Sequence, residues 1–147
     1  NLKFVDNDKF IFFSNYSSPK SIAFSSHNQI GALIYWPSIN IQIRIKAKID
    51  KTTTKYNNEY FNKRSLDKNA LAISSNQSQK ILSYNNVIKK YQTVRNIQDL
   101  SKCPNYWGGF LFVPYYFEFW EGHESRLNKR IAFERSNKNW NQCILEP

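Results

Sequence analysis

The chain has 147 residues, of which 41% are hydrophobic and 16% aromatic, and its 21 Lys and Arg residues outnumber 11 Asp and Glu residues, for a net charge of +10. This length and apolar content predict one compact domain, residues 1–147, with its own core. The charge favours anionic partners such as phosphate esters, nucleic acid or acidic lipid, without choosing among them. No stretch reaches the roughly 18 apolar residues of a membrane span, and no charged start leads into an apolar segment, so we expect a soluble cytoplasmic protein.

The cysteines and histidines give no sign of a metal site. Cys103 and Cys143 lie far apart and form no CxxC pair, which indicates two thiols rather than a zinc site or a disulfide framework. His27 and His123 have no Cys or acidic cluster at metal spacing, so we expect no metal. The chain contains no Met and begins at Asn1, and we expect its natural N-terminus to lie upstream.

The first part of the chain predicts two strands separated by a short helix. Residues 9–15 are aromatic and β-branched, which is typical of a strand. Pro19 suits the first turn of a helix over residues 20–26. The continuous apolar run 30–36 predicts a strand buried on both faces, and Pro37 ends it.

Residues 39–49 carry the clearest periodic pattern in the chain. Apolar and polar side chains alternate there, which predicts a strand with one dry face. The dry face consists of Ile41, Ile43, Ile45, Ala47 and Ile49, and the polar face of Gln42, Arg44, Lys46 and Lys48.

The middle of the chain predicts helices, and its end predicts strands. Helices are expected over residues 57–64, 66–75 and 79–95, followed by a loop over residues 96–106. Strands are expected over residues 109–120, 130–135 and 140–145, with a bend or bulge at Gly108 and Gly109 and a turn at residues 136–139. Five or six strands with the helices grouped between them indicate a mainly β or α+β fold.

Two groups of residues could bind a ligand. Tyr60 and Arg64, four residues apart on one helical face, could clasp a phosphate, because the guanidinium fork donates two hydrogen bonds and the phenol donates a third. Arg126, Asn128 and Arg130 would point the same way along an extended strand after Trp120. An ordinary solvated surface remains the alternative for both groups.

Six motifs in order along the chain resemble the signatures of the pyridoxamine 5'-phosphate oxidase family. They are FFSNYSSPK, YFNKR, SNQS, PNYWGGFLFVP, EFWEGHESRLNKR and the terminal LEP. The resemblance covers nearly the whole chain. It implies an FMN-binding split β-barrel with flanking helices, a homodimer, and an active site built from both subunits.

The resemblance also implies residue roles, which we carry over position by position. The expected FMN contacts are Ser14 and Lys20 at the phosphate, with Gln42, Gln77, Ser78, Trp120 and Arg130 elsewhere on the cofactor. The expected contacts to the substrate, a phosphorylated B6 vitamer, are Lys3, Tyr60, Arg64, Lys68 and Arg126. Arg126 and Asn128 occupy the catalytic positions beside the substrate ring.

The reaction that the resemblance implies is oxidation of pyridoxamine or pyridoxine 5'-phosphate to pyridoxal 5'-phosphate, with O2 as the acceptor. Three departures keep an alternative open: Asn128 replaces a histidine, Lys129 an aspartate, and Pro19 an arginine at the flavin phosphate. The alternative is a diverged split-barrel flavoprotein that binds FMN or pyridoxal phosphate with little or no oxidase activity. His123 is a candidate to replace the missing histidine in part, although a solvent-exposed loop residue is the plainer interpretation.

A third hypothesis is a nucleic-acid-binding barrel, because the chain is basic and its aromatic residues could stack on bases. The basic residues are scattered, however, and no RNA-binding signature is present. We therefore expect neither nucleic acid nor a membrane as a partner.

Overall fold

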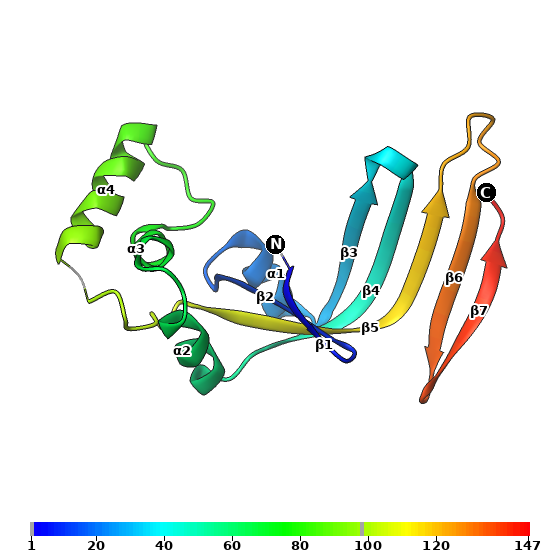
Figure 1. Ribbon diagram of the computed structural model, residues 1–147, viewed down its shortest axis with the longest axis horizontal. Helices are drawn as coiled ribbons and strands as arrows, with labels where there is room; N and C mark the ends of the chain where they lie inside the picture. The colour runs from blue at the N-terminus through cyan, green and yellow to red at the C-terminus, as the bar shows by residue number, and fades with distance from the viewer. Residues whose placement is uncertain (1, 98) are drawn as a thin grey trace.

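The computed structural model describes residues 2–97 and 99–147. In this part of the chain, strands form one antiparallel sheet and the longer helices gather beyond one end of it (Figure 1). The elements in order are β1 (Leu2–Asp6), β2 (Lys9–Asn15), α1 (Pro19–Ser26), β3 (Gln29–Trp36), the 3-10 helix η1 (Pro37–Ile39), β4 (Ile41–Lys51), α2 (Thr54–Asn62), α3 (Leu66–Ser74), α4 (Tyr84–Ile97), β5 (Trp107–Glu121), β6 (Lys129–Ser136) and β7 (Asn139–Leu145).

Strand β5 organises the sheet, because its two halves have different neighbours along one edge. The first half pairs with β2 and the second half with β6, while β4 runs along the other edge. Pro114 lies at the change of neighbour, opposite a register shift between Lys46 and Ala47 of β4. Proline has no N–H to donate, so its place at such an irregularity is expected. The exchange of partners lets the β6–β7 hairpin diverge from β1 and β2 (Figure 1).

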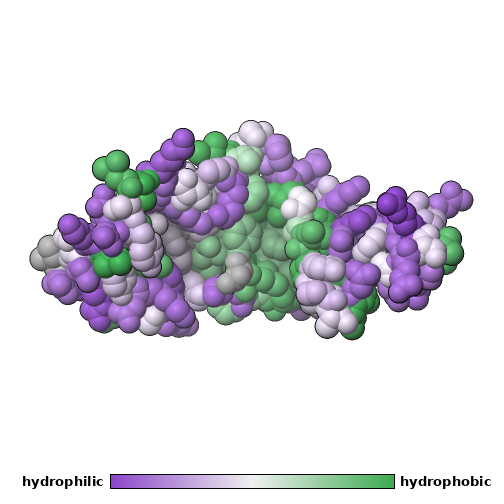
Figure 2. Space-filling view, turned by 90° about the horizontal axis from the view of Figure 1, so that it is seen from above, coloured by the Kyte–Doolittle hydropathy of each residue, from purple (hydrophilic) through white to green (hydrophobic). Residues whose placement is uncertain are grey.

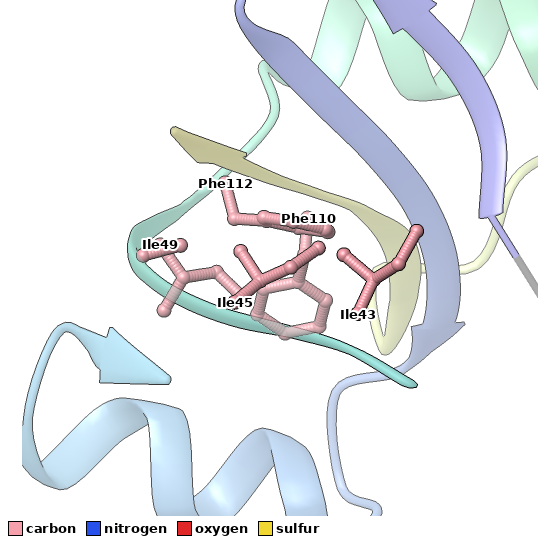
Figure 3. Packing of buried hydrophobic residues seen from close by; sticks show 6 residues of the cluster. Ile43, Ile45, Ile49, Phe110 and Phe112 are labelled. Carbon is pink, nitrogen blue, oxygen red and sulfur yellow. The ribbon is translucent and has the colours of Figure 1, made fainter. Parts of the chain in front are cut away.

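The core lies on the dry face predicted for residues 39–49, which confirms that prediction. Alternate β4 side chains pack against two phenylalanines of β5 (Figure 3). Burying each Ile or Phe side chain contributes about 1.5–3 kcal/mol. The cluster consists of Ile43, Ile45, Ala47, Ile49, Phe110 and Phe112.

The prediction of a strand buried on both faces is wrong for strand β3. In the described part of the chain it pairs with β4 alone, which leaves its outer edge without a neighbouring strand. Leu33 is 62% exposed, and Tyr35 and Trp36 are each nearly half exposed. The apolar run is therefore uncovered in a single chain. A surface of this kind is typical of a protein interface.

The helices differ from the predicted ranges at their ends. Helix α2 ends at Asn62, so Arg64 lies beyond it, and α4 begins at Tyr84 rather than at residue 79. The backbone N–H of Asn86 donates to Ser83 Oγ (3.3 Å), a side-chain cap that explains the late start of α4. Strand β1 is a further element that the sequence patterns do not predict. No helix in residues 2–97 and 99–147 is long and apolar enough to cross a membrane.

The glycine pair lies within regular strand pairing, so the expected bend or bulge is wrong. Gly108 and Gly109 pair in register with Ser14 and Phe13 of β2. A Cβ on Gly108 would overlap the Tyr16 hydroxyl. Gly108 is therefore needed for this close approach rather than for a turn.

Candidate functional site

The first group of candidate site residues lies at the start of β5. We call it the Trp107 cluster: Phe13, Tyr60, Arg64 and Trp107. Phe13 of β2 stacks on Tyr60 of α2, with ring centroids 3.9 Å apart, and on Trp107 of β5 at 5.1 Å. The Arg64 guanidinium lies over the Trp107 ring, 4.4 Å from its centroid. Such a cation over an aromatic face is electrostatically favourable. The packing of α2 against β5 thus places a cation and a phenol beside an aromatic floor.

Arg64 is only partly satisfied within the chain. Its Nη2 donates to the Lys68 backbone carbonyl (3.1 Å), whereas its Nη1 is buried and has no hydrogen-bond partner among the described residues. Burial lowers the pKa of Arg64, and an arginine in a protein nevertheless stays charged. A buried donor without an acceptor costs about 1–3 kcal/mol. An anionic ligand would remove that cost.

Tyr60 and Arg64 both lie near the Trp107 ring, but not in the way that their spacing predicts. The two side chains do not share one helical face, because Arg64 follows the last turn of α2. Each is placed by Trp107: the Tyr60 and Trp107 ring centroids are 6.3 Å apart, and the Arg64 guanidinium lies over the same indole. Lys68 contributes its backbone carbonyl to Arg64, while its side chain is exposed on α3. Lys3 is exposed on β1, next to Phe4, whose ring makes an edge contact with Tyr60.

A second group joins the end of β2 to the segment after α3, and we call it the serine corner: Ser14, Asn15, Ser18, Ser21 and Gln77. Gln77 Oε1 accepts from Ser14 Oγ (3.1 Å) and from the Asn15 backbone N–H (3.0 Å). Ser18 Oγ lies 3.4 Å from Ser14 Oγ and 2.9 Å from Ser21 Oγ. Two predicted FMN contacts far apart in the sequence, Ser14 and Gln77, are thus brought together.

Two other predicted FMN contacts flank the serine corner. Ser78 directly follows Gln77 and has a left-handed backbone conformation, with φ 68°. Lys20 lies on α1 and lines an apolar hollow of about 340 Å³. Figure 2 shows hydrophobic side chains gathering in the middle of the molecule, between polar surfaces at either end. The other residues lining the hollow are Leu2, Phe10, Phe12, Phe24, Ile30, Gly31, Ala32, Leu33, Ile34, Ile45 and Phe112.

The third group lies near the end of β5, and we call it the Glu118 cluster: Gln42, Arg44, Tyr116, Glu118, Trp120 and Arg130. Trp120 pairs in register with Gln42 of β4 on one side and with Arg130 of β6 on the other. Three predicted FMN contacts therefore form one row across neighbouring strands. Glu118 lies two residues earlier on β5, so its side chain is on the same face of the sheet.

Glu118 is the centre of this cluster and is only 4% exposed. Its Oε1 accepts from Arg130 Nε (2.8 Å) and from Arg44 Nη1 (3.1 Å), and its Oε2 accepts from the Tyr116 hydroxyl (3.0 Å). The Arg130 hydrogen bond, assisted by Tyr116 and Arg44, holds the pKa of Glu118 below its usual value. Arg130 Nη1 also donates to the Glu146 carbonyl (2.8 Å), which ties the C-terminal LEP motif to the cluster.

The loop between β5 and β6 contradicts the predicted extended row of Arg126, Asn128 and Arg130. Arg126 has φ 62° and lies in a turn, where its backbone N–H donates to the His123 carbonyl (2.9 Å). Asn128 Oδ1 accepts from the His123 backbone N–H (3.1 Å), so the Asn128 side chain closes this loop. Both predicted catalytic residues therefore belong to one exposed loop beside Trp120 and Arg130. His123 is itself exposed, and its Nδ1 accepts from the Ser125 backbone N–H (3.2 Å).

Arg44, Glu118 and Trp107 belong to the two clusters, although the predicted roles do not include them. Arg44 shares the polar face of β4 with Gln42, and Glu118 is the acidic residue inside an aromatic run. Both could therefore be predicted as candidates from the sequence. Trp107 receives its role from the packing of α2, which no local pattern reports. Cys103 and Cys143 are free thiols, and no group of acidic, Cys or His residues in the described ranges could hold a metal.

The Trp107 cluster and the Glu118 cluster are far apart within one chain. They occupy opposite ends of β5, a strand of 15 residues. Trp107 and Glu118 are 11 residues apart on it, so at about 3.3 Å per residue the strand covers roughly 36 Å between them. One ligand cannot contact both clusters of the same chain.

The C-terminal residues 107–147 match the family model described as the pyridoxine 5'-phosphate oxidase C-terminal dimerisation region. The chain is 35% identical to pyridoxine/pyridoxamine 5'-phosphate oxidase 1 of Hydrogenovibrio crunogenus, over 99% of this chain and 69% of that protein. It is 33% identical to the pyridoxine/pyridoxamine 5'-phosphate oxidase of Coxiella burnetii, over 99% of this chain and 74% of that protein.

Two solved structures share the fold. PhzG from Burkholderia lata 383, in complex with tetrahydrophenazine-1-carboxylic acid, matches with a TM-score of 0.86 and 22% identity, over 99% of this chain and 72% of that chain. A pyridoxamine 5'-phosphate oxidase-related, FMN binding protein from Nostoc punctiforme matches with a TM-score of 0.74 and 12% identity, over 99% of this chain and 77% of that chain. These structures confirm the expected split-barrel fold. The sequence relatives show that this chain belongs to the pyridoxine/pyridoxamine 5'-phosphate oxidase family.

Proposed function

We propose that the protein is an FMN-dependent oxidase that converts pyridoxamine or pyridoxine 5'-phosphate into pyridoxal 5'-phosphate. The observation that carries the proposal is Arg64, which lies against the Trp107 ring and whose buried Nη1 lacks an acceptor within residues 2–97 and 99–147. A phosphate group would supply the missing acceptor. Membership of the oxidase family supports the same conclusion.

The residues present fit FMN as the cofactor that the family implies. Trp120 offers a flat face, with the Gln42 amide and the Arg130 guanidinium on either side of it. The Lys20 ammonium, exposed on α1, is suited to the phosphate of the cofactor, whereas the Ser14 hydroxyl already donates to Gln77 Oε1. The chemistry that FMN would supply when bound is acceptance of a hydride from the C4' carbon of the substrate and reduction of O2 to hydrogen peroxide.

The protein's own groups have to bind and orient the substrate and the cofactor, and to exclude water. The Trp107 cluster holds the substrate phosphate, and the Glu118 cluster holds the flavin ring in a fixed position. For the amine substrate, oxidation gives an imine, and water then releases ammonia and the aldehyde. Arg126, in the exposed loop beside Trp120 and Arg130, is the candidate to contact the substrate ring.

We further propose that the active unit is a homodimer with sites shared between subunits. Each chain carries the two clusters too far apart for one ligand, so the Trp107 cluster of one subunit has to meet the Glu118 cluster of its partner. The exposed apolar side chains of β3 and the apolar hollow are surfaces that a second subunit would cover. The match of residues 107–147 to a dimerisation region supports this arrangement.

Asn128 favours a second candidate, a flavoprotein that binds FMN or pyridoxal phosphate with little oxidation. An amide cannot take up or release a proton near neutral pH, and Asn128 Oδ1 is already bonded to the loop backbone. Turnover that depends on a proton transfer at this position would be slow.

An absorption spectrum and a peroxide assay together test the proposal. Purified protein titrated with FMN should bind it and then release peroxide and pyridoxal phosphate in equal amounts when pyridoxamine 5'-phosphate is added. Binding of FMN without peroxide would favour the second candidate. No FMN binding would overturn the oxidase, and failure to bind either FMN or pyridoxal 5'-phosphate would overturn both candidates.

A further inference from the structure

Arg44 is a charged residue of the Glu118 cluster to which the proposed reaction assigns no task. It lies on β4 two positions after Gln42, on the same face of the sheet, and pairs in register with Glu118. Its Nη1 donates to Glu118 Oε1 (3.1 Å), and its Nε and Nη2 each lie 3.4 Å from Gln42 Oε1. The guanidinium also lies 5.6 Å from the centroid of the Trp120 ring. One arginine therefore contacts the carboxylate, the amide and the indole.

The chemistry of arginine decides how the Gln42 amide is turned. A guanidinium carries only donors, so the end of the amide that faces Arg44 has to be the carbonyl oxygen. The NH2 group of Gln42 then points away from Arg44. Because Glu118 is buried and bonded to Arg44, the arginine cannot swing aside without leaving a buried carboxylate with one donor fewer.

The side-chain amide of Gln77, at the serine corner, is oriented in the same way as that of Gln42. Its Oε1 accepts from the Asn15 backbone N–H, which can only donate. Both predicted FMN-contacting glutamines thus turn their oxygens inward and present NH2 groups. The chain uses two unrelated devices, an arginine and a backbone amide, to reach the same amide orientation.

We propose that Arg44 is a positioning residue, which locks the Gln42 amide so that its NH2 group donates to a carbonyl oxygen or ring nitrogen of the bound cofactor. The inference rests on the proposed function for the identity of that cofactor as FMN. Arg44 acts through Gln42 and need not contact the cofactor. Its removal should leave the fold in place and release the amide.

The first measurement uses the protein without cofactor. The side-chain NH2 signals of Gln42 are assigned by NMR from their loss in Gln42→Ala. In the unaltered protein the amide should be rigid, with an order parameter near 0.8, and in Arg44→Leu it should fall below about 0.6. Arg135→Leu is the matched control, because Arg135 also donates to a carboxylate, that of Asp8, on another part of the sheet. A mobile Gln42 amide in the unaltered protein would overturn the inference whether or not FMN binds.

The second measurement is a double-mutant cycle on FMN binding, followed by flavin fluorescence. Arg44→Leu and Gln42→Ala should each weaken binding roughly tenfold. Adding Arg44→Leu to Gln42→Ala should change the affinity by no more than about twofold, because the residue through which Arg44 acts is gone. Gln42→Glu keeps a partner for Arg44 but has no NH2 group, so it should bind FMN as weakly as Gln42→Ala.

The outcomes separate the two proposals. Independent, additive effects of the Arg44 and Gln42 changes would overturn the positioning role while leaving FMN binding intact. A rigid, Arg44-dependent Gln42 amide in a protein that does not bind FMN would overturn the proposed function and support the orienting role of Arg44.

Discussion

The Trp107 cluster and the Glu118 cluster share strand β5, yet they differ in whether their buried polar groups have hydrogen-bond partners. At the Trp107 end, aromatic rings surround a guanidinium whose Nη1 has no acceptor among the described residues. At the Glu118 end, a buried carboxylate accepts from two arginines and a tyrosine. In the described part of the chain, the first cluster keeps an unused donor, whereas the second is satisfied by its own residues.

This difference indicates how the two halves of the proposed site divide the work. A group that lacks an acceptor gains most from a ligand that brings one, which suits the capture of a phosphate. A network that is already satisfied costs little to organise when a ligand arrives, which suits the stacking and orienting of a flavin ring. In each cluster, substitutions should distinguish residues that stabilise the fold from residues that hold a ligand.

The two tryptophans provide the largest expected contrast. Trp107 is 7% exposed and supports Phe13, Tyr60 and Arg64, so Trp107→Ala should lower the free energy of unfolding by about 3–5 kcal/mol. Trp120 is only partly buried, so Trp120→Ala should cost about 1 kcal/mol while FMN binding is lost. Urea denaturation at one fixed protein concentration measures the free energy of unfolding of both variants. Equal losses of stability would contradict the contrast.

Arg64 should show the reverse balance, with a loss of binding and no loss of stability. Arg64→Leu removes an Nη1 that is buried without an acceptor among the described residues, but it also removes the hydrogen bond to the Lys68 carbonyl and the contact with Trp107, so the free energy of unfolding should change little. Affinity for pyridoxal 5'-phosphate should fall up to about 100-fold, since hydrogen bonds between charged groups are lost. Arg95→Leu, which breaks the exposed pair with Asp67, is the control and should leave binding unchanged. A clear loss of stability in Arg64→Leu with unaltered binding would contradict this account.

Acid should weaken the Glu118 cluster, and this is the smallest expected effect. The pKa of Glu118 is lowered in the folded protein, chiefly by the Arg130 hydrogen bond. A carboxyl with a lowered folded pKa stabilises the fold above its unfolded pKa, about 4.3, and this contribution is lost as the pH falls through the folded value. The unaltered protein should therefore be more stable than Glu118→Gln at pH 7, and the difference should shrink below about pH 4.3. A difference that does not vary with pH in urea denaturation would contradict the ionised state of Glu118.

The sequence predicts the core and much of the Glu118 row because both depend on alternation. Once residues 39–49 form a strand with a dry face, Gln42 and Arg44 have to share the other face. The exposure of β3 does not follow in the same way, since an apolar run indicates burial without indicating which surface covers it. The run 30–36 therefore misleads when a single chain is considered.

Other parts of the site depend on packing or on local turns. Arg64 and Trp107 meet only because α2 packs on β5, and no spacing in the sequence encodes that contact. Arg126 leaves the expected strand because the loop after β5 places it in a left-handed turn. The start of α4, by contrast, could have been predicted from the sequence, because Ser83 is a good N-terminal cap.

The central claim is that each site joins the Trp107 cluster of one subunit to the Glu118 cluster of the other, and a mixed dimer tests it most directly. Arg64→Leu and Trp120→Ala chains, carrying different tags, are co-expressed and the mixed dimer is isolated. With FMN in excess, each parent should bind little pyridoxal 5'-phosphate, whereas the mixed dimer should recover about half the binding capacity of the unaltered protein, because one of its two sites is intact. A mixed dimer that binds no more than its parents would contradict the shared site.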